Sequence, residues 1–215
     1  MVNDYTINGI FPCPVYVTKR DTNLDSTEEK EIEDIIAEGM FLDGTCGEAQ
    51  DQHTDNTYIF NTNLKNLKEF CEEHIKNYVK KIIVPKNEEL DFYITQSWLN
   101  VVEPGGEIYP HWHANSIISG TFYLTVEEDD TIKFNDPFWK YKHCMEMDNR
   151  EFNLWNSMSW NFPVNSNELF LFPSWLDHKV ESNEKATTNR ISLSFNTFVR
   201  GPLGSRARIN ELILR

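Results

Sequence analysis

One segment of the chain decides the predicted fold: Arg190-Ile191-Ser192-Leu193-Ser194-Phe195-Asn196. Its side chains alternate strictly between polar and apolar, which is the pattern of a β-strand whose successive residues point to opposite faces of a sheet. The three apolar residues should therefore share one face, and the arginine, the serines and the asparagine the other. A polar inner face with an apolar outer face fits a barrel whose interior holds a charged ligand.

The same two-residue period runs through most of the second half of the chain. Short strands with turns between them are predicted at 92–102, 107–113, 117–126, 131–134, 169–172, 179–181 and 191–199. Two helices precede them. The first is capped by Ser26 or Thr27, and the second runs from about Leu64 to Ile83 and ends before Pro85. This order predicts an α+β fold, with a double-stranded β-helix (a jelly-roll or cupin-like core) and N-terminal helices packed on one side.

The length of 215 residues fits a single domain. Residues 1–90 should form a mainly helical support region, 91–200 the β-helix core and 201–215 a C-terminal tail. Residues 44–56 are rich in glycine and polar side chains, which predicts a loop. The segment 135–167 is long and rich in aromatic residues, so it is either a lid over the site or a flap that packs on the barrel.

The composition argues against several classes of protein. The formal net charge of −14 argues against a nucleic-acid-binding protein, because phosphate contacts need a basic face. The acidic run from Glu127 to Asp130 should be a solvated turn. We find neither an apolar stretch long enough to span a membrane nor the pattern of a signal peptide. The four cysteines form no CxxC pair, so we expect reduced thiols and a cytoplasmic location.

Three histidines suggest a metal site. His111 and His113 are two residues apart, so on an extended strand they face the same point, and His178 can reach them from a distant strand. Three such ligands on one side of a metal leave its other positions open, as a catalytic site requires. Arg190 follows His178 by a dozen positions and offers a bidentate partner for a carboxylate.

Two stretches of the sequence resemble a subgroup of the 2-oxoglutarate/Fe(II)-dependent oxygenases. The first, from Trp98 to Leu124, contains His111-Trp112-His113-Ala114-Asn115 and Ser119-Gly120-Thr121-Phe122-Tyr123-Leu124. The second, from Leu169 to Asn196, contains Phe172-Pro173-Ser174-Trp175-Leu176-Asp177-His178 and then the segment that begins at Arg190. Together they cover the C-terminal half of the chain. The resemblance implies a double-stranded β-helix with Fe(II) at its mouth, and 2-oxoglutarate decarboxylated with O2 while a C–H bond is oxidised.

The expected iron ligands are His111, His113 and His178. The superfamily usually has HxD or HxE as its first motif, and His113 stands where that carboxylate is expected. Asp177 does not replace it, because neighbours on a strand point to opposite faces. We therefore expect Asp177 at the surface or as an outer partner of the site.

The expected anchors of 2-oxoglutarate are Arg190 and Ser192, which would hold its distal carboxylate. Asn100, Asn115 and Tyr123 are candidates for its other end, and a structural role explains each of these three equally well.

The predicted function is a 2-oxoglutarate- and Fe(II)-dependent oxygenase, most simply a hydroxylase, whose substrate is a protein side chain or a metabolite. Two alternatives stay open. One is a three-histidine cupin-type dioxygenase that does not use 2-oxoglutarate and offers Arg190 to a substrate carboxylate. The other is a binding module that has kept the barrel without the chemistry.

Overall fold

The computed structural model describes residues 6–43, 51–142, 145 and 147–215. The first part of the described chain contains helices and three short strands: β1 (Tyr16–Lys19), α1 (Ser26–Glu38), β2 (Phe41–Asp43), β3 (Asp51–Thr54), η1 (Ile59–Asn61), α2 (Lys65–Tyr78) and the π-helical turn η2 (Val79–Ile83). The remainder is mostly strand: β4 (Asp91–Val102), β5 (Ile108–His111), β6 (Ile118–Thr125), β7 (Thr131–Asn135), α3 (Trp139–Lys142), β8 (Ser159–Pro163), β9 (Glu168–Pro173), β10 (His178–Val180), β11 (Arg190–Leu203), η3 (Arg206–Arg208) and β12 (Leu212–Leu214).

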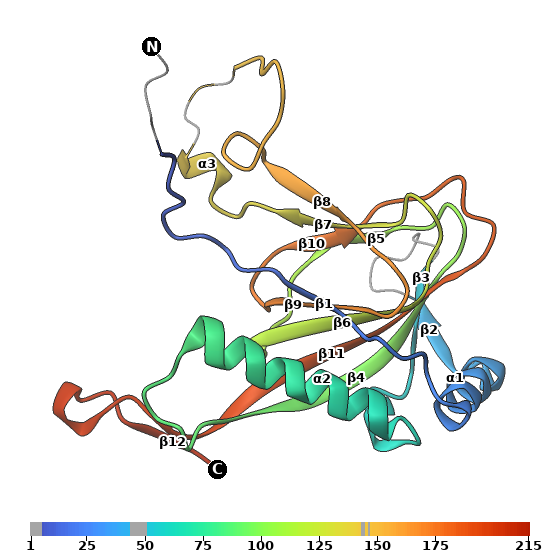
Figure 1. Ribbon diagram of the computed structural model, residues 1–215, viewed down its shortest axis with the longest axis horizontal. Coiled ribbons are helices and arrows are strands. Elements are labelled where there is room, and N and C mark those ends of the chain that lie inside the picture. Colours follow the sequence, from blue (N-terminus) through green and yellow to red (C-terminus); the bar gives the residue numbers. More distant parts are fainter. Residues whose placement is uncertain (1–5, 44–50, 143–144, 146) are drawn as a thin grey trace.

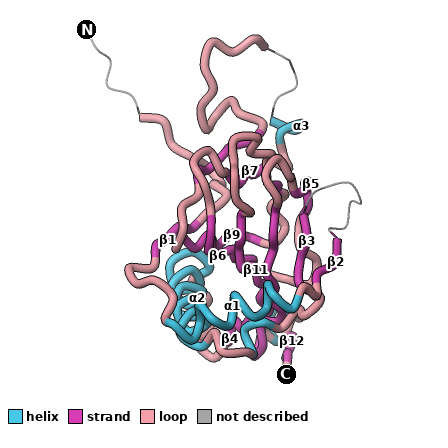
Figure 2. Tube along the Cα trace, turned by 90° about the vertical axis from the view of Figure 1, so that its right-hand side faces the viewer, coloured by secondary structure: helices cyan, strands magenta, loops and turns pink. Residues whose placement is uncertain are grey.

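Two antiparallel sheets form the core (Figure 1). Within the described residues, the larger sheet has the strand order β1-β9-β6-β11-β4-β3-β2, with β12 paired to the end of β11. The smaller sheet has the order β5-β10-β7-β8. Helices α1 and α2 lie along the larger sheet, while α3 lies at the opposite end of the molecule (Figures 1 and 2). The predicted fold is confirmed: the chain is a double-stranded β-helix with N-terminal helices on one side.

The N-cap residue of α1 differs from the one that the sequence suggested. Asp25, and not Ser26 or Thr27, is the N-cap, because its carboxylate accepts hydrogen bonds from the backbone N–H groups of Thr27 and Glu28. The Glu28 side chain in turn accepts from the Asp25 N–H, which completes a capping box. The second helix was predicted well, since α2 and η2 together fill the expected range.

Four described strands were not predicted: β2, β3, β8 and β12. The expected loop at 44–56 contains β3, whose sequence Asp51-Gln52-His53-Thr54 has no apolar alternation but whose backbone pairs with β4. The expected lid contains β8, which pairs with β7 at an edge of the smaller sheet. Residues 44–50 of the expected loop, and residues 143, 144 and 146 of the expected lid, lie outside the described part of the chain.

Two apolar clusters hold the layers together. One lies between the larger sheet and the helices and includes Leu193 and Phe195 from β11 with Leu67 and Ile75 from α2. The other lies on the inner side of the sheets, and its buried members are Tyr123, Ile132, Phe134, Val164, Phe170, Phe172 and Leu176. Among the described helices, none combines the length and the apolar character that crossing a membrane requires.

Gly120 shows how closely the first cluster is packed. It pairs directly with Phe195 across β6 and β11, and a Cβ added at Gly120 would lie 2.2 Å from the nearest atom of the Phe195 ring. Only a residue without a side chain leaves room for this ring.

We therefore expect Gly120→Ala to destabilise the protein by about 1–3 kcal/mol, the usual cost of overpacking a core. Urea unfolding would measure this change in the free energy of unfolding. Gly9→Ala is the control, because a Cβ at Gly9 would lie at ordinary contact distance, 3.4 Å from Trp155, and should change stability by less than about 0.5 kcal/mol. Equal stability of the wild type and Gly120→Ala would contradict the packing described here.

Candidate metal centre

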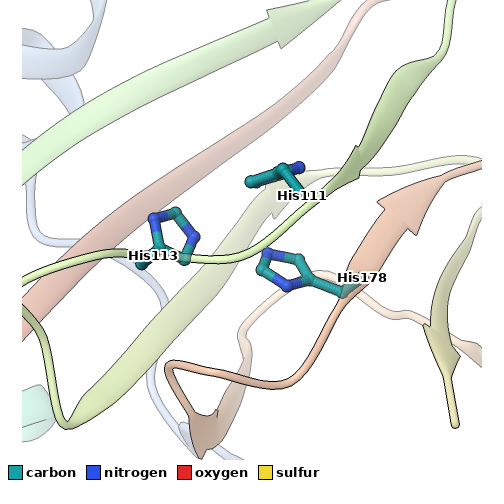
Figure 3. Close-up of side chains that lie close together, drawn as sticks. All are labelled: His111, His113 and His178. Atoms are coloured by element: carbon teal, nitrogen blue, oxygen red, sulfur yellow. The ribbon is translucent and has the colours of Figure 1, made fainter. Parts of the chain in front are cut away.

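Strand pairing brings the three predicted histidines together. His111 ends β5, His178 begins β10, and the two residues are direct partners across these antiparallel strands. His113 follows the end of β5, and its backbone N–H donates to the Ser174 carbonyl at 2.9 Å. Figure 3 shows the three side chains converging from these segments. One ligand nitrogen from each ring lies within 4.8 Å of the other two.

The backbone orients two of the three rings. The Nδ1 atom of His111 lies 2.8 Å from the Tyr109 carbonyl oxygen, and that of His178 lies 2.9 Å from the Leu176 carbonyl oxygen. A carbonyl can only accept, so each Nδ1 carries the proton and each Nε2 keeps a free lone pair. Metal-binding histidines are commonly fixed by this kind of outer hydrogen bond.

Burial keeps two of the imidazoles neutral. Desolvation, helped by the neighbouring His111, lowers the pKa of His113 to about 4. Desolvation also lowers the pKa of His178 well below its usual value, with further contributions from His111 and His113. The rings of Phe134 and Phe172 pack against His178, with centroid separations of 6.1 and 4.6 Å, and contribute to its apolar surroundings. At neutral pH both His113 and His178 are therefore in the form that binds a metal.

The donor set fits an iron ion. Nitrogen ligands about 2.1 Å from one metal lie at most about 4.2 Å apart, so the histidines need only small side-chain movements to share an ion. Asp177 is not in this group; its carboxylate instead accepts a hydrogen bond from the Asn135 side chain. This placement agrees with the expectation that the side chains of Asp177 and His178 point to opposite faces of the strand.

The polar face predicted for β11 points between the sheets. Asn100 donates to Ser194 at 2.9 Å, and Ser119 donates to Asn196 at 2.8 Å. Leu193 and Phe195 lie on the other face, in the cluster under the helices. The alternation of β11 thus separates a hydrogen-bonded interior from an apolar exterior, as its sequence predicted.

Arg190 is buried at the beginning of β11. Its Nη1 donates to the Thr131 carbonyl at 3.2 Å and lies 3.7 Å from a carboxylate oxygen of Asp130. Burial lowers the pKa of Arg190. The expectation of a solvated turn at 127–130 was wrong for Asp130, which is only 4% exposed. The sequence offers no signal that separates Asp130 from the exposed acids beside it.

The other expected co-substrate residues occupy different environments. Ser192 is buried on the inner face of β11, and it pairs with Asn100 on β4 and with Tyr123 on β6. Tyr123 is buried in the inner apolar cluster. Asn115 lies on an exposed turn at a left-handed φ of 54°, a conformation that asparagine tolerates well. A role for any of them in binding 2-oxoglutarate stays a prediction.

The two other histidines within the described residues, His53 and His74, are separate from this group. His74 on α2 hydrogen-bonds the Tyr16 hydroxyl at 2.7 Å, and Nδ1 of His53 lies 3.1 Å from the Thr54 carbonyl oxygen. His143 lies outside the described residues.

Sequence comparison finds one family match. Residues 96–196, which contain every residue of the histidine group and Arg190, match the family described as "Putative 2OG-Fe(II) oxygenase". The matched segment is just under half of the chain. The match implies Fe(II), 2-oxoglutarate and O2 as cofactor and co-substrates, and the histidine group fits the iron. No curated protein matches the sequence at a significant level.

Solved structures with this fold are distant in sequence. A prolyl-4-hydroxylase from Pseudomonas putida is 11% identical, with 86% of this chain and 94% of that chain covered and a TM-score of 0.57. A prolyl hydroxylase from Trichoplax adhaerens, solved with a peptide of hypoxia inducible factor, is 11% identical, with 86% and 83% covered and a TM-score of 0.59. The carbocyclase SnoK of nogalamycin biosynthesis is also 11% identical, with 86% and 79% covered and a TM-score of 0.58. At these identities the likeness concerns the fold.

We expect His178→Ala and His113→Ala to lose most of their affinity for Fe(II), since each removes a ligand. The loss should exceed the roughly 10- to 100-fold typical of changes to the outer partners of ligands. Anaerobic titration with Fe(II), or with Mn(II) as a stable substitute, would measure it. His74→Ala is the control, because His74 lies on α2 and outside the group.

His113→Asp should retain the metal, because it supplies the carboxylate more usual at this position of the superfamily. Wild-type metal affinity in His113→Ala would show that His113 is not a ligand, and the same result in His178→Ala would remove the proposed centre.

Proposed function

We propose that this protein is an Fe(II)- and 2-oxoglutarate-dependent oxygenase that acts as a hydroxylase, with iron held by His111, His113 and His178. The observation that carries the proposal is the convergence of three histidines, two of them with oriented rings, in a segment that matches the oxygenase family. Iron and 2-oxoglutarate, when bound, would supply the oxidising chemistry with O2 as the oxidant: 2-oxoglutarate becomes succinate and CO2, and a C–H bond becomes C–OH. The protein contributes binding, orientation and a dry interior.

The placement of Arg190 supports a role in holding the distal carboxylate of 2-oxoglutarate. Its guanidinium contacts Thr131 at one end of β7, and Phe134, three residues further along β7, pairs with His178. Three residues of strand span about 10 Å. A five-carbon dicarboxylate can bridge such a distance between a metal on the histidines and the arginine.

Ser192 is two residues from Arg190 on the same face of β11, and we assign it a hydrogen bond to the same carboxylate. Asn100 and Tyr123 are opposite Ser192 in the two neighbouring strands, which makes them the next candidates. Asn115 is the weakest, because its exposed turn already explains its residue type.

Aromatic side chains around the histidines suggest where the primary substrate binds. Trp112, between two of the proposed ligands, is 60% exposed, and Trp175, in the turn that leads to His178, is 50% exposed. The hydrogen bond from the His113 N–H to Ser174 joins these two segments. Phe138 packs edge-on against Trp175, with ring centroids 6.2 Å apart. We assign these three residues to the substrate-binding face, and residues 136–142, which follow β7, to a lid that brings Phe138 to it.

Such a face favours a substrate with an apolar or planar group, either a protein side chain or a metabolite, because exposed tryptophan and phenylalanine give large contact areas. The acidic net charge of −14 makes nucleic acid the least favoured class.

The composition of the metal group also favours a second function. The described metal group contains three histidines and no carboxylate, a donor set that also suits a three-histidine dioxygenase that does not use 2-oxoglutarate. In that case Arg190 would bind a carboxylate of the substrate.

Binding of 2-oxoglutarate separates the two functions. We expect the wild-type protein, loaded with Mn(II) under anaerobic conditions, to bind 2-oxoglutarate in titration calorimetry. Arg190→Ala should weaken binding roughly thirtyfold to several-thousandfold, since truncating one partner of a buried charged pair typically costs about 2–5 kcal/mol. Arg190→Lys should restore only part of the affinity, because its ammonium cannot make a bidentate contact.

Arg200→Ala is the matched control, because Arg200 lies further along β11, is exposed, and pairs with Asp91. If the wild type does not bind 2-oxoglutarate, or if Arg190→Ala binds it as well as the wild type, the proposed oxygenase gives way to the dioxygenase or to a binding module.

A further inference from the structure

Asp130 is the buried acid closest to the proposed co-substrate anchor. Its carboxylate lies 3.7 Å from Nη1 of Arg190, and the two side chains are 4% and 6% exposed. A buried carboxylate is stable only when hydrogen bonds and an opposite charge compensate for its loss of water. Both are present around Asp130.

Three neighbours fix the position of Asp130. The Glu127 N–H donates to Oδ2 at 2.9 Å, and the Asn183 side-chain amide donates to Oδ1 at 3.1 Å. The same Asn183 amide donates to the Glu128 carbonyl at 2.9 Å, which ties it to the turn. The Val164 N–H donates to the Asp130 carbonyl at 3.1 Å. These hydrogen bonds hold the Asp130 carboxylate in place independently of its contact with Arg190.

This rigid acid restrains the arginine from one side. Nη1 contacts both the Thr131 carbonyl and the Asp130 carboxylate, so these two oxygens define the position of one corner of the guanidinium. A guanidinium has five N–H donors in a planar fork, and the others remain available for a carboxylate. A small cavity of about 10 Å³ lies beside the pair and is lined in part by Val102, Asn183 and Arg190.

We propose that Asp130 is a positioning residue, which holds Arg190 in the orientation that receives the distal carboxylate of the co-substrate, and that Asn183 in turn holds Asp130. The inference rests on the proposed function, since it takes Arg190 as the anchor of 2-oxoglutarate. It adds two residues, both outside the family's histidine pattern, to the binding of the co-substrate.

The interaction predicts a thermodynamic coupling. If Asp130 acts through Arg190, then Asp130→Ala should weaken 2-oxoglutarate binding at least about 10-fold in the wild-type background, because it removes one partner of a buried ion pair. In an Arg190→Ala background the same change should have less than about a twofold effect, because the residue that Asp130 positions is already gone. General structural damage would instead weaken binding equally in both backgrounds.

A second ligand tests whether Asp130 acts on the distal carboxylate of the co-substrate. 2-Oxobutyrate has the 2-oxo acid group of 2-oxoglutarate but lacks the distal carboxylate. Asp130→Ala should therefore leave 2-oxobutyrate binding unchanged while reducing the preference for 2-oxoglutarate. Anaerobic titration calorimetry on the full chain loaded with Mn(II) measures both ligands, and Mn(II) titration confirms that the centre is intact.

Asn183→Ala provides a milder variant should Asp130→Ala fail to fold, and it should weaken 2-oxoglutarate binding severalfold with the same dependence on Arg190. The control is Asp129→Asn, a neighbouring acid that is 56% exposed and pairs with Lys185; asparagine also suits its φ of 72°.

The outcomes distinguish this inference from the proposed function. Wild-type protein that does not bind 2-oxoglutarate overturns both. If Arg190→Ala loses binding but Asp130→Ala and Asn183→Ala bind like the wild type, only the positioning role is overturned. Equal losses in the two backgrounds also overturn it.

Discussion

The pairing of β10 with β5 is the constraint on which the rest of the site depends. It places His178 opposite His111, while the bond from the His113 N–H to Ser174 holds the third histidine against the turn that precedes β10. Strand β10 also pairs with β7, and the Thr131 carbonyl of β7 accepts a hydrogen bond from Arg190. Two neighbouring strand pairings thus relate the histidines to the arginine.

The chemistry of the interior follows from the separation of two environments. The apolar face of β11 is covered by α2 and its neighbours, whereas its polar face lies between the sheets. Within that interior, burial keeps the pKa of His113 and His178 low, and Asp130 compensates the charge of Arg190. The proposed site would therefore combine neutral histidines with a positive side chain, because the buried charge of Arg190 has Asp130 as a partner.

The sequence predicted the parts of this arrangement that depend on local periodicity. The alternation from Arg190 to Asn196 indicated the two faces of β11, and the spacing of His111 and His113 with a distant His178 indicated the metal group. Two of the missed strands show the limits of this approach. Strand β3 is polar throughout, and β8 alternates between polar and aromatic residues but lies in a segment whose length and aromatic content suggested a lid. Both are held by backbone pairing with a neighbour, which composition does not reveal.

The same limit explains Asp130. In the sequence it is the last of four consecutive acids, and only the fold distinguishes the one that turns inward to meet Asn183 and Arg190 from those that remain in solvent. Long-range contacts of this kind join residues 53 and 60 positions apart in the chain, as the numbering of Asp130, Asn183 and Arg190 shows.

The most direct test of the central claim is the fate of 2-oxoglutarate when the protein is supplied with Fe(II) and O2. The account predicts slow formation of succinate, even without the primary substrate, that requires both Fe(II) and O2 and is absent in His178→Ala. Failure of the iron-loaded wild type to form succinate, although it binds 2-oxoglutarate and is exposed to O2, would contradict the account and favour a binding module.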